Sequence, residues 1–121
     1  MPSEPVTSGQ IFVDEPMPGQ VRAALSGNLD LLNAQPLSEE LRALLSRERP
    51  RVLMLDASGV DFCDCSALQM LLDVHDEGQR LDARVVISRA SPAIERLLRL
   101  FDLTGLFGYP TAGPAGGESI G

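Results

Sequence analysis

The chain has 121 residues and a mass of 13.0 kDa, a size that suits one domain with a single hydrophobic core. Its formal net charge is −7, and its ten basic residues are all arginines scattered along the chain, so nucleic acid is not expected as a partner. The lack of lysine removes the phosphate-binding lysine of a Walker loop and any Schiff base, which argues against a self-contained ATPase or lyase.

The two ends of the chain differ in composition from the middle. Residues 1–9 and 110–121 are rich in Pro, Gly, Ser and Thr and are expected to be disordered, which leaves one domain over residues 10–109. The N-terminus has no signal-peptide pattern, and no apolar run approaches the roughly 18 residues that span a bilayer. We therefore expect a cytoplasmic protein with no membrane contact, whose two cysteines are reduced.

The first half of the domain predicts a hairpin and a helix. Residues 10–14 and 20–26 read as two short strands around a Pro/Gly turn at Pro16–Gly19, forming an edge hairpin. The next segment predicts an amphipathic helix that ends before Pro50, with Asn33 as a possible N-cap. Its apolar positions recur at i, i+4, i+7 and i+8, namely Leu37, Leu41, Leu44 and Leu45.

The second half predicts a strand, helix, strand unit and a final helix. Val52–Leu55 is an apolar run typical of a strand buried on both faces or in mid-sheet, and Val85–Ile87 predicts the next strand. The helix between them is expected to begin near Ser66 and to end at Gly78 as a left-handed cap. Its expected apolar face consists of Leu68, Leu71 and Leu72.

Ser91 and Pro92 form a helix start, as an N-cap followed by a proline in the first turn. The expected buried stripe is Ile94, Leu97, Leu98 and Phe101, and after Gly105 the residues Leu106 and Phe107 should fold back onto the core. The element order is ββαβαβα, which indicates an α/β domain with one mixed sheet and helices packed on one side or one end.

The stretch Asp61–Leu68, with the sequence DFCDCSAL, contains both cysteines, two carboxylates and a serine at a strand-to-helix junction. Zinc is disfavoured because the whole chain offers only two Cys and one His. A Cys65–His75 catalytic dyad is excluded if both lie on one helix, where ten residues separate them by about 15 Å. His75 is better explained as a packed or capping residue near a helix end.

Three further roles stay open for this stretch. A disulfide between Cys63 and Cys65 is possible only with strain, so Cys63 is better read as a buried hydrophobe and Cys65 as a thiol of undecided reactivity. A hydroxyl at a helix start suits a phosphoryl group, because unpaired N–H donors and the helix dipole favour an anion there. A simple helix cap is the more common role of such a serine.

Residues 52–68, VLMLDASGVDFCDCSAL, resemble the central signature of STAS domains, in particular the bacterial anti-sigma factor antagonists. Two other segments agree with the family in order and spacing, namely LSGNLD at 25–30 and the ending from Ser91–Ile94 to Leu103–Phe107. The resemblance covers roughly residues 10–108. It implies a single STAS-like mixed sheet with flanking helices.

The resemblance also implies a function as a binding module without a cofactor, not an enzyme. Family members bind an anti-sigma factor of the serine kinase type and so release a sigma factor, which regulates transcription. The kinase ends the binding by phosphorylating the antagonist, and a phosphatase restores it. The implied partner-binding residues are Asp30, Asp64, Cys65, Ser66 and Leu68. The protein is expected to be a monomer or a homodimer.

The chain departs from the family at the switch itself. Cys65 stands at the phosphoacceptor position and is no substrate for a serine kinase, while Ser66 is a candidate substitute, Ala67 replaces a glycine and Asn28 replaces a glutamate. Three outcomes follow: Ser66 phosphorylation, constitutive binding, or sensitivity of Cys65 to oxidation. The rival functions are a STAS-type accessory subunit of a transport ATPase, a small-ligand sensor, and a thiol enzyme, which lacks a partner base.

Overall fold

The computed structural model describes residues 10–110. The segments expected to be disordered, 1–9 and 110–121, lie outside this range except for Pro110. The strands are β1 (Gln10–Met17), β2 (Gln20–Leu29), β3 (Val52–Cys63) and β4 (Arg84–Ala90), and the helices are α1 (Ala34–Glu48), α2 (Cys65–Arg80) and α3 (Pro92–Leu100). This order confirms the predicted ββαβαβα sequence of elements in an α/β domain.

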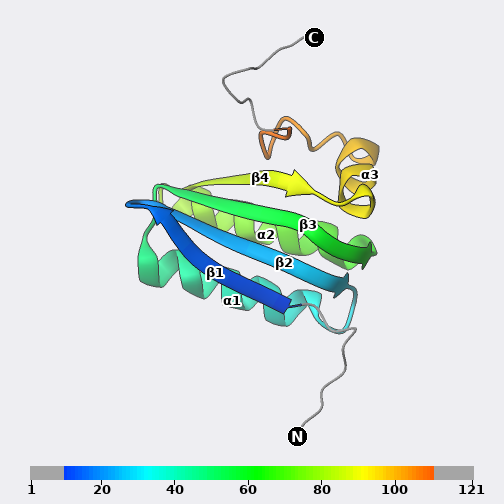
Figure 1. Cartoon of the computed structure of the whole chain (residues 1–121), viewed down its shortest axis with the longest axis horizontal. Coiled ribbons are helices and arrows are strands. Elements are labelled where there is room, and N and C mark those ends of the chain that lie inside the picture. Colours follow the sequence, from blue (N-terminus) through cyan, green and yellow to red (C-terminus); the bar gives the residue numbers. More distant parts are fainter. Residues whose placement is uncertain (1–9, 111–121) are drawn as a thin grey trace, which may run out of the picture.

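The four strands form one mixed sheet in the order β1-β2-β3-β4. β1 and β2 are an antiparallel hairpin, whereas β2–β3 and β3–β4 are parallel pairs connected through α1 and α2 (Figure 1). β2 and β3 therefore end at the same edge of the sheet, where Leu29 lies beside Cys63. The two loops that follow these strands are neighbours for that reason.

Both long helices cover one face of the sheet, and α3 lies at the end where β3 finishes and the α2 segment begins (Figure 1). The core between helices and sheet is built almost wholly from aliphatic side chains. Burial alternates along β2 and the first half of β3, so Leu53 and Leu55 are fully buried while Val52 and Met54 are only partly covered. β3 thus lies mid-sheet, but it is not buried on both faces.

β3 is much longer than the apolar run Val52–Leu55 that predicts it. It continues through polar residues to Cys63 because β2 pairs with it along this length, with register shifts beyond Ala24 and Gly27. Gly27 has a φ of 86°, which favours glycine, and a Cβ on Gly59 would lie 3.0 Å from the Leu25 carbonyl oxygen. The backbones of the two strands therefore approach closely at this bulge.

The predicted cap of α2 at Gly78 is wrong. The helix continues to Arg80, and Gly78 lies inside it, where a Cβ would come within 2.6 Å of the Val85 side chain and 2.9 Å of the Ala83 carbonyl oxygen. A glycine is needed there because helix and β4 touch, not because the backbone turns left-handed. Leu71 is buried as expected, but Leu68 and Leu72 are only partly covered.

The start of α3 agrees with its prediction. The Ser91 hydroxyl accepts a hydrogen bond from the Ile94 amide at 3.3 Å, with Pro92 in the first turn. Phe101, however, is 44% exposed and lies beyond the end of the helix instead of completing its buried stripe. Phe107 folds back into the core as predicted, whereas Leu106 lies 44% exposed.

Candidate functional site

The predicted site lies at the carboxyl ends of β2 and β3. The Asp64 amide donates a hydrogen bond to the Leu29 carbonyl at 3.2 Å, which joins the β3–α2 junction directly to the end of β2. Asp30 follows Leu29 and Cys65 follows Asp64. The structure thereby brings the β2–α1 turn and the start of α2 to one end of the molecule.

Asp64 is the N-cap of α2. Its backbone is extended, with φ −120° and ψ −167°, and its carboxylate accepts a hydrogen bond from the Ser66 amide at 2.8 Å. Its carbonyl also accepts from the Ala67 amide at 3.0 Å. The helix therefore begins at Cys65, one residue earlier than predicted, and Ser66 is not its cap.

The β2–α1 turn is held by its own polar side chains. The Asp30 carboxylate accepts from the Leu32 amide at 3.0 Å, and the Asp30 amide donates to Asn33 Oδ1 at 3.0 Å. Asn33 Nδ2 also donates to the Asn28 carbonyl at 2.6 Å. Asn33 stands at the N-cap position of α1 as predicted, but its side chain braces the turn and makes no capping bond to the helix.

This turn presents two leucines to solvent. Leu31 is 77% exposed and Leu32 is 86% exposed, and sequence reasoning did not single out either. Adjacent exposed leucines are typical of a surface that another molecule covers. The signal in the sequence is the pair of leucines directly after Asp30. This pair does not continue the apolar spacing of the helix that follows.

Cys65 and Ser66 lie in different surroundings although they are consecutive. Cys65 is exposed and lines an apolar groove of about 310 Å³ beside α3. Ser66 is half-buried and lines a pocket of about 170 Å³ between α1 and α2. The other residues of the Ser66 pocket are Leu31, Ala34, Gln35, Gln69, Met70 and Asp73, none of them basic.

Leu68 lies one turn further along α2 and is partly buried, with its side chain packed against the core. His75 packs on Phe107, with the two ring centroids 5.5 Å apart in an edge-on arrangement. It is thus a packed residue, as expected, at the opposite half of α2 from Cys65.

Both cysteines are free thiols in this structure. Cys63 ends β3, and its Sγ donates to the Ala93 carbonyl at 3.5 Å. Burial raises the pKa of the Cys63 thiol, the Asp64 carboxylate adds to this effect, and the Arg96 guanidinium opposes it. Cys63 is only partly buried, not fully buried as predicted, but its raised pKa makes it a poor nucleophile near neutral pH.

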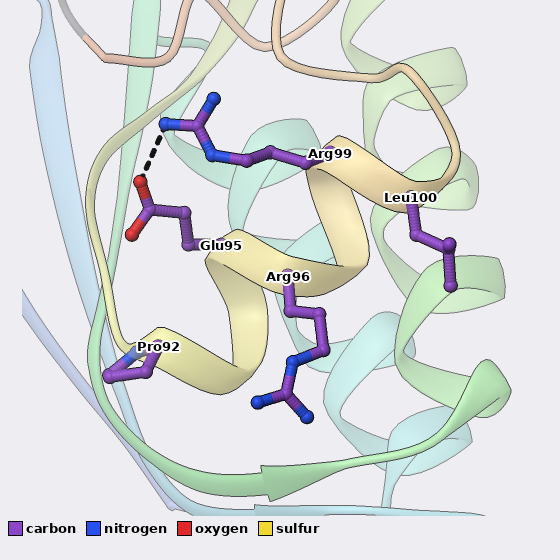
Figure 2. Close-up of a pocket in the computed structure, with 5 residues that line it drawn as sticks. All are labelled: Pro92, Glu95, Arg96, Arg99 and Leu100. Carbon is purple, nitrogen blue, oxygen red and sulfur yellow. Dashed lines mark hydrogen bonds and ion pairs between the residues drawn. The ribbon is translucent and has the colours of Figure 1, made fainter.

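A second group of residues that sequence reasoning missed as part of a site lies on and around α3. Phe62, Leu100 and Phe101 are exposed by 52%, 73% and 44%, and they border the Cys65 groove together with Arg96. Figure 2 shows that Arg96 and Leu100 project from α3 away from the side that carries the Arg99–Glu95 pair. Within residues 10–110 no group of three potential metal ligands gathers, and no helix is long and apolar enough to cross a bilayer.

Comparison with known proteins agrees with this architecture. A protein-family model described as "Mlab, STAS domain" matches residues 15–108. An anti-sigma factor antagonist from Mycobacterium paratuberculosis is similar in structure, with 26% identity, a TM-score of 0.72, and coverage of 90% of this chain and 92% of that one.

Two other solved structures share the fold at lower identity. The anti-sigma factor antagonist SpoIIAA in its unphosphorylated form has 14% identity and a TM-score of 0.69, with 80% of this chain and 84% of that chain covered. A sulfate transporter family protein from Wolinella succinogenes has 18% identity and a TM-score of 0.62, with 78% and 75% covered. Because the family match spans most of the chain and the mixed sheet agrees with these relatives, the protein belongs to the STAS domain family.

Proposed function

We propose that the protein is an anti-sigma factor antagonist, which binds an anti-sigma factor of the serine kinase type in the cytoplasm and so releases a sigma factor. The observation that carries this proposal is the joining of two exposed loops at one end of the sheet. The Asp64–Leu29 hydrogen bond fixes Asp30 and the exposed Leu31–Leu32 pair beside the start of α2. The antagonists of similar structure support it.

In this proposal the protein acts by binding and catalyses no reaction. The contact surface consists of Asp30, Asp64, Cys65, Ser66 and the exposed part of Leu68. The Asp64 carboxylate caps α2 by accepting from the Ser66 amide, so its role is to hold the helix start in place. Cys65 is exposed directly at this start. A side chain there can contact a partner without any rearrangement of the fold.

We propose that the binding is constitutive as regards phosphorylation. Cys65 offers no hydroxyl to a kinase. Ser66 is half-buried in a pocket that contains the Asp73 carboxylate and no basic side chain, so a phosphoryl dianion there would meet a like charge. Ser66 is therefore an unfavourable substitute acceptor. In that case no phosphatase is needed to restore binding.

The binding test uses the purified full chain and the serine-kinase-type anti-sigma factor encoded in the same genome. Isothermal titration calorimetry should detect a complex, and the absence of heat with a correctly folded chain would reject this partner. Incubation with the kinase and ATP, followed by intact-mass measurement, should give no phosphate gain in the wild type. A gain in Cys65→Ser alone would show that the thiol had disabled the switch, whereas phosphate on Ser66 would contradict constitutive binding.

The second candidate function is an accessory subunit of a transporter. The similarity in fold to the sulfate transporter family protein of Wolinella succinogenes favours it. A transport ATPase that co-purifies with the full chain, while no anti-sigma factor does, would decide for this function. The same surface at the start of α2 would then serve a different partner.

A further inference from the structure

A groove lies between the end of β3 and α3, and we name it the α3 groove. It has a volume of about 310 Å³. Its lining consists of Phe62, Cys63, Asp64, Cys65, Ala93, Arg96, Leu97, Leu100 and Phe101. Two of these residues, Asp64 and Cys65, also belong to the surface of the proposed function, so the groove continues that surface onto α3.

The walls of the α3 groove are large apolar side chains that the fold does not cover. Phe62 is 52% exposed, Leu100 is 73% exposed and Phe101 is 44% exposed, although Leu97 between them is buried. Three neighbouring residues of this kind form a contiguous apolar patch, which is typical of an interaction site and unusual on a free surface. None of the three is needed to fill the core of the domain.

Arg96 is the one basic residue of the groove lining, and the one acidic residue, Asp64, accepts a hydrogen bond from the Ser66 amide at 2.8 Å. Within residues 10–110 Arg96 forms no ion pair, whereas Arg99, one turn further along α3, is paired with Glu95 at 2.7 Å (Figure 2). Both arginines are exposed on the same helix. Arg96 therefore keeps its donors available at the groove, and the natural complement of a guanidinium is a carboxylate.

A second copy of this chain fits the α3 groove poorly. A symmetric dimer through the groove would bring two unpaired Arg96 guanidinium groups towards the two-fold axis, where like charges repel. An occupant that combines apolar side chains with a carboxylate satisfies both features of the groove. An amphipathic helix with one acidic residue beside its apolar stripe has this chemistry.

We propose that the α3 groove binds an amphipathic, acidic segment of the same anti-sigma factor that contacts the start of α2. This inference rests on the proposed function and extends its interface to α3. Phe62, Leu100 and Phe101 contact the apolar side chains of that segment, and Arg96 pairs with its carboxylate. Cys65 lies between the two parts of the interface, so a partner that covers both also covers the thiol.

The test compares two pairs of variants by titration calorimetry of the full chain with the anti-sigma factor. Arg96→Glu should weaken binding by about 10- to 100-fold, because it places a like charge before the carboxylate, while Arg99→Glu should change it less than about threefold. Leu100→Asp should weaken binding by a similar factor, whereas Leu106→Asp, exposed by 44% and outside the groove, should not. All four positions are exposed, and thermal unfolding checks that each variant folds.

The outcomes separate this inference from the proposed function. If the wild type binds the anti-sigma factor and the Arg96→Glu and Leu100→Asp variants bind as tightly, the groove inference is wrong and the proposed function stands. If the wild type does not bind, the proposed function fails, and this role of the groove fails with it. If sedimentation shows a wild-type dimer that Leu100→Asp dissociates, a second copy occupies the groove and the inference is also overturned.

Discussion

The amide of Asp64 donates a hydrogen bond to the carbonyl of Leu29, at 3.2 Å. This bond joins the end of β2 to the N-cap residue of α2, the helix that follows the neighbouring strand β3. Two segments more than thirty residues apart in the sequence are thereby held as one surface. The hydrogen bond sets the position of Cys65 relative to the exposed Leu31–Leu32 pair. A partner that contacts both therefore requires this bond to be intact.

Replacement of Asp64 should separate its capping role from its charge. Asp64→Ala removes the carboxylate that accepts from the Ser66 amide, and we expect a loss of about 1 kcal/mol in the free energy of unfolding. Asp64→Asn keeps an equivalent acceptor and should stay within about 0.5 kcal/mol of the wild type. Urea denaturation monitored by circular dichroism measures both. Equal losses in the two variants would show that charge, not capping, stabilises the start of α2.

The two cysteines should differ in reaction rate with iodoacetamide near pH 8. Cys65 is exposed, whereas burial raises the pKa of Cys63 and its thiol is bound to the Ala93 carbonyl. We expect Cys65 to react at least about tenfold faster in the folded protein. The Cys63→Ser and Cys65→Ser variants isolate each rate by mass spectrometry, and unfolding in urea should bring the rates together. Equal rates in the folded protein would refute the distinction.

Gly78→Ala should destabilise the protein although alanine favours helices. The added Cβ would lie 2.6 Å from the Val85 side chain and 2.9 Å from the Ala83 carbonyl, so the helix must move away from β4. The helix-propensity gain is about 1 kcal/mol, and we expect overpacking to exceed it and leave a net loss of about 1–2 kcal/mol. Gln79→Ala, exposed on the same helix, is the control and should be nearly neutral. A more stable Gly78→Ala variant would contradict the close packing.

Asp56 should contribute to the loss of stability in acid. Burial acts to raise its pKa, but the hydrogen bonds from Ser58 and the charges of Arg89 and Arg22 outweigh burial and lower it. Since the pKa is lower in the folded than in the unfolded chain, the stabilisation is full above an ordinary Asp pKa of about 4. It is lost as the pH falls through the folded value.

Asp56→Asn should therefore lose less stability than the wild type between about pH 6 and about pH 2.5. Urea midpoints measured across this range give the difference. Ser58→Ala removes one of the two hydrogen bonds and should fall between the wild type and Asp56→Asn. Parallel pH profiles for all three proteins would show that this carboxylate has no linked effect on folding.

Local signals in the sequence predicted the elements well where the cause is local. The Ser91–Pro92 helix start and the buried positions Ile94, Leu97 and Leu98 follow from capping chemistry and the helical period. The prediction of a cap at Gly78 is wrong because this position lacks room for a side chain next to β4, a contact that no spacing within α2 reveals. Phe101 fits the helical stripe by spacing, but α3 ends at Leu100, so the ring lies outside the stripe.

In the candidate site, too, local features could be predicted from the sequence, whereas contacts between distant segments could not. The junction at Asp64–Ser66 was recognisable from its sequence, but the different surroundings of Cys65 and Ser66 depend on α3 and α1, which approach the junction from distant parts of the chain. Arg96 carried no signal in the sequence. Its importance comes from the absence of an ion pair within residues 10–110, and only the packed structure reveals that.

The segment after α3 changes which edge of the sheet is open to another strand. The Ile87 amide donates to the Phe107 carbonyl at 3.0 Å, and the Phe107 ring is fully buried, so the chain itself covers the outer side of β4 at Ile87. Within residues 10–110, β1 is the other edge strand, and no segment of this range is hydrogen-bonded to its outer side. A strand supplied by another chain is therefore expected to add to β1 before it adds to β4, where it would first have to displace the segment around Phe107.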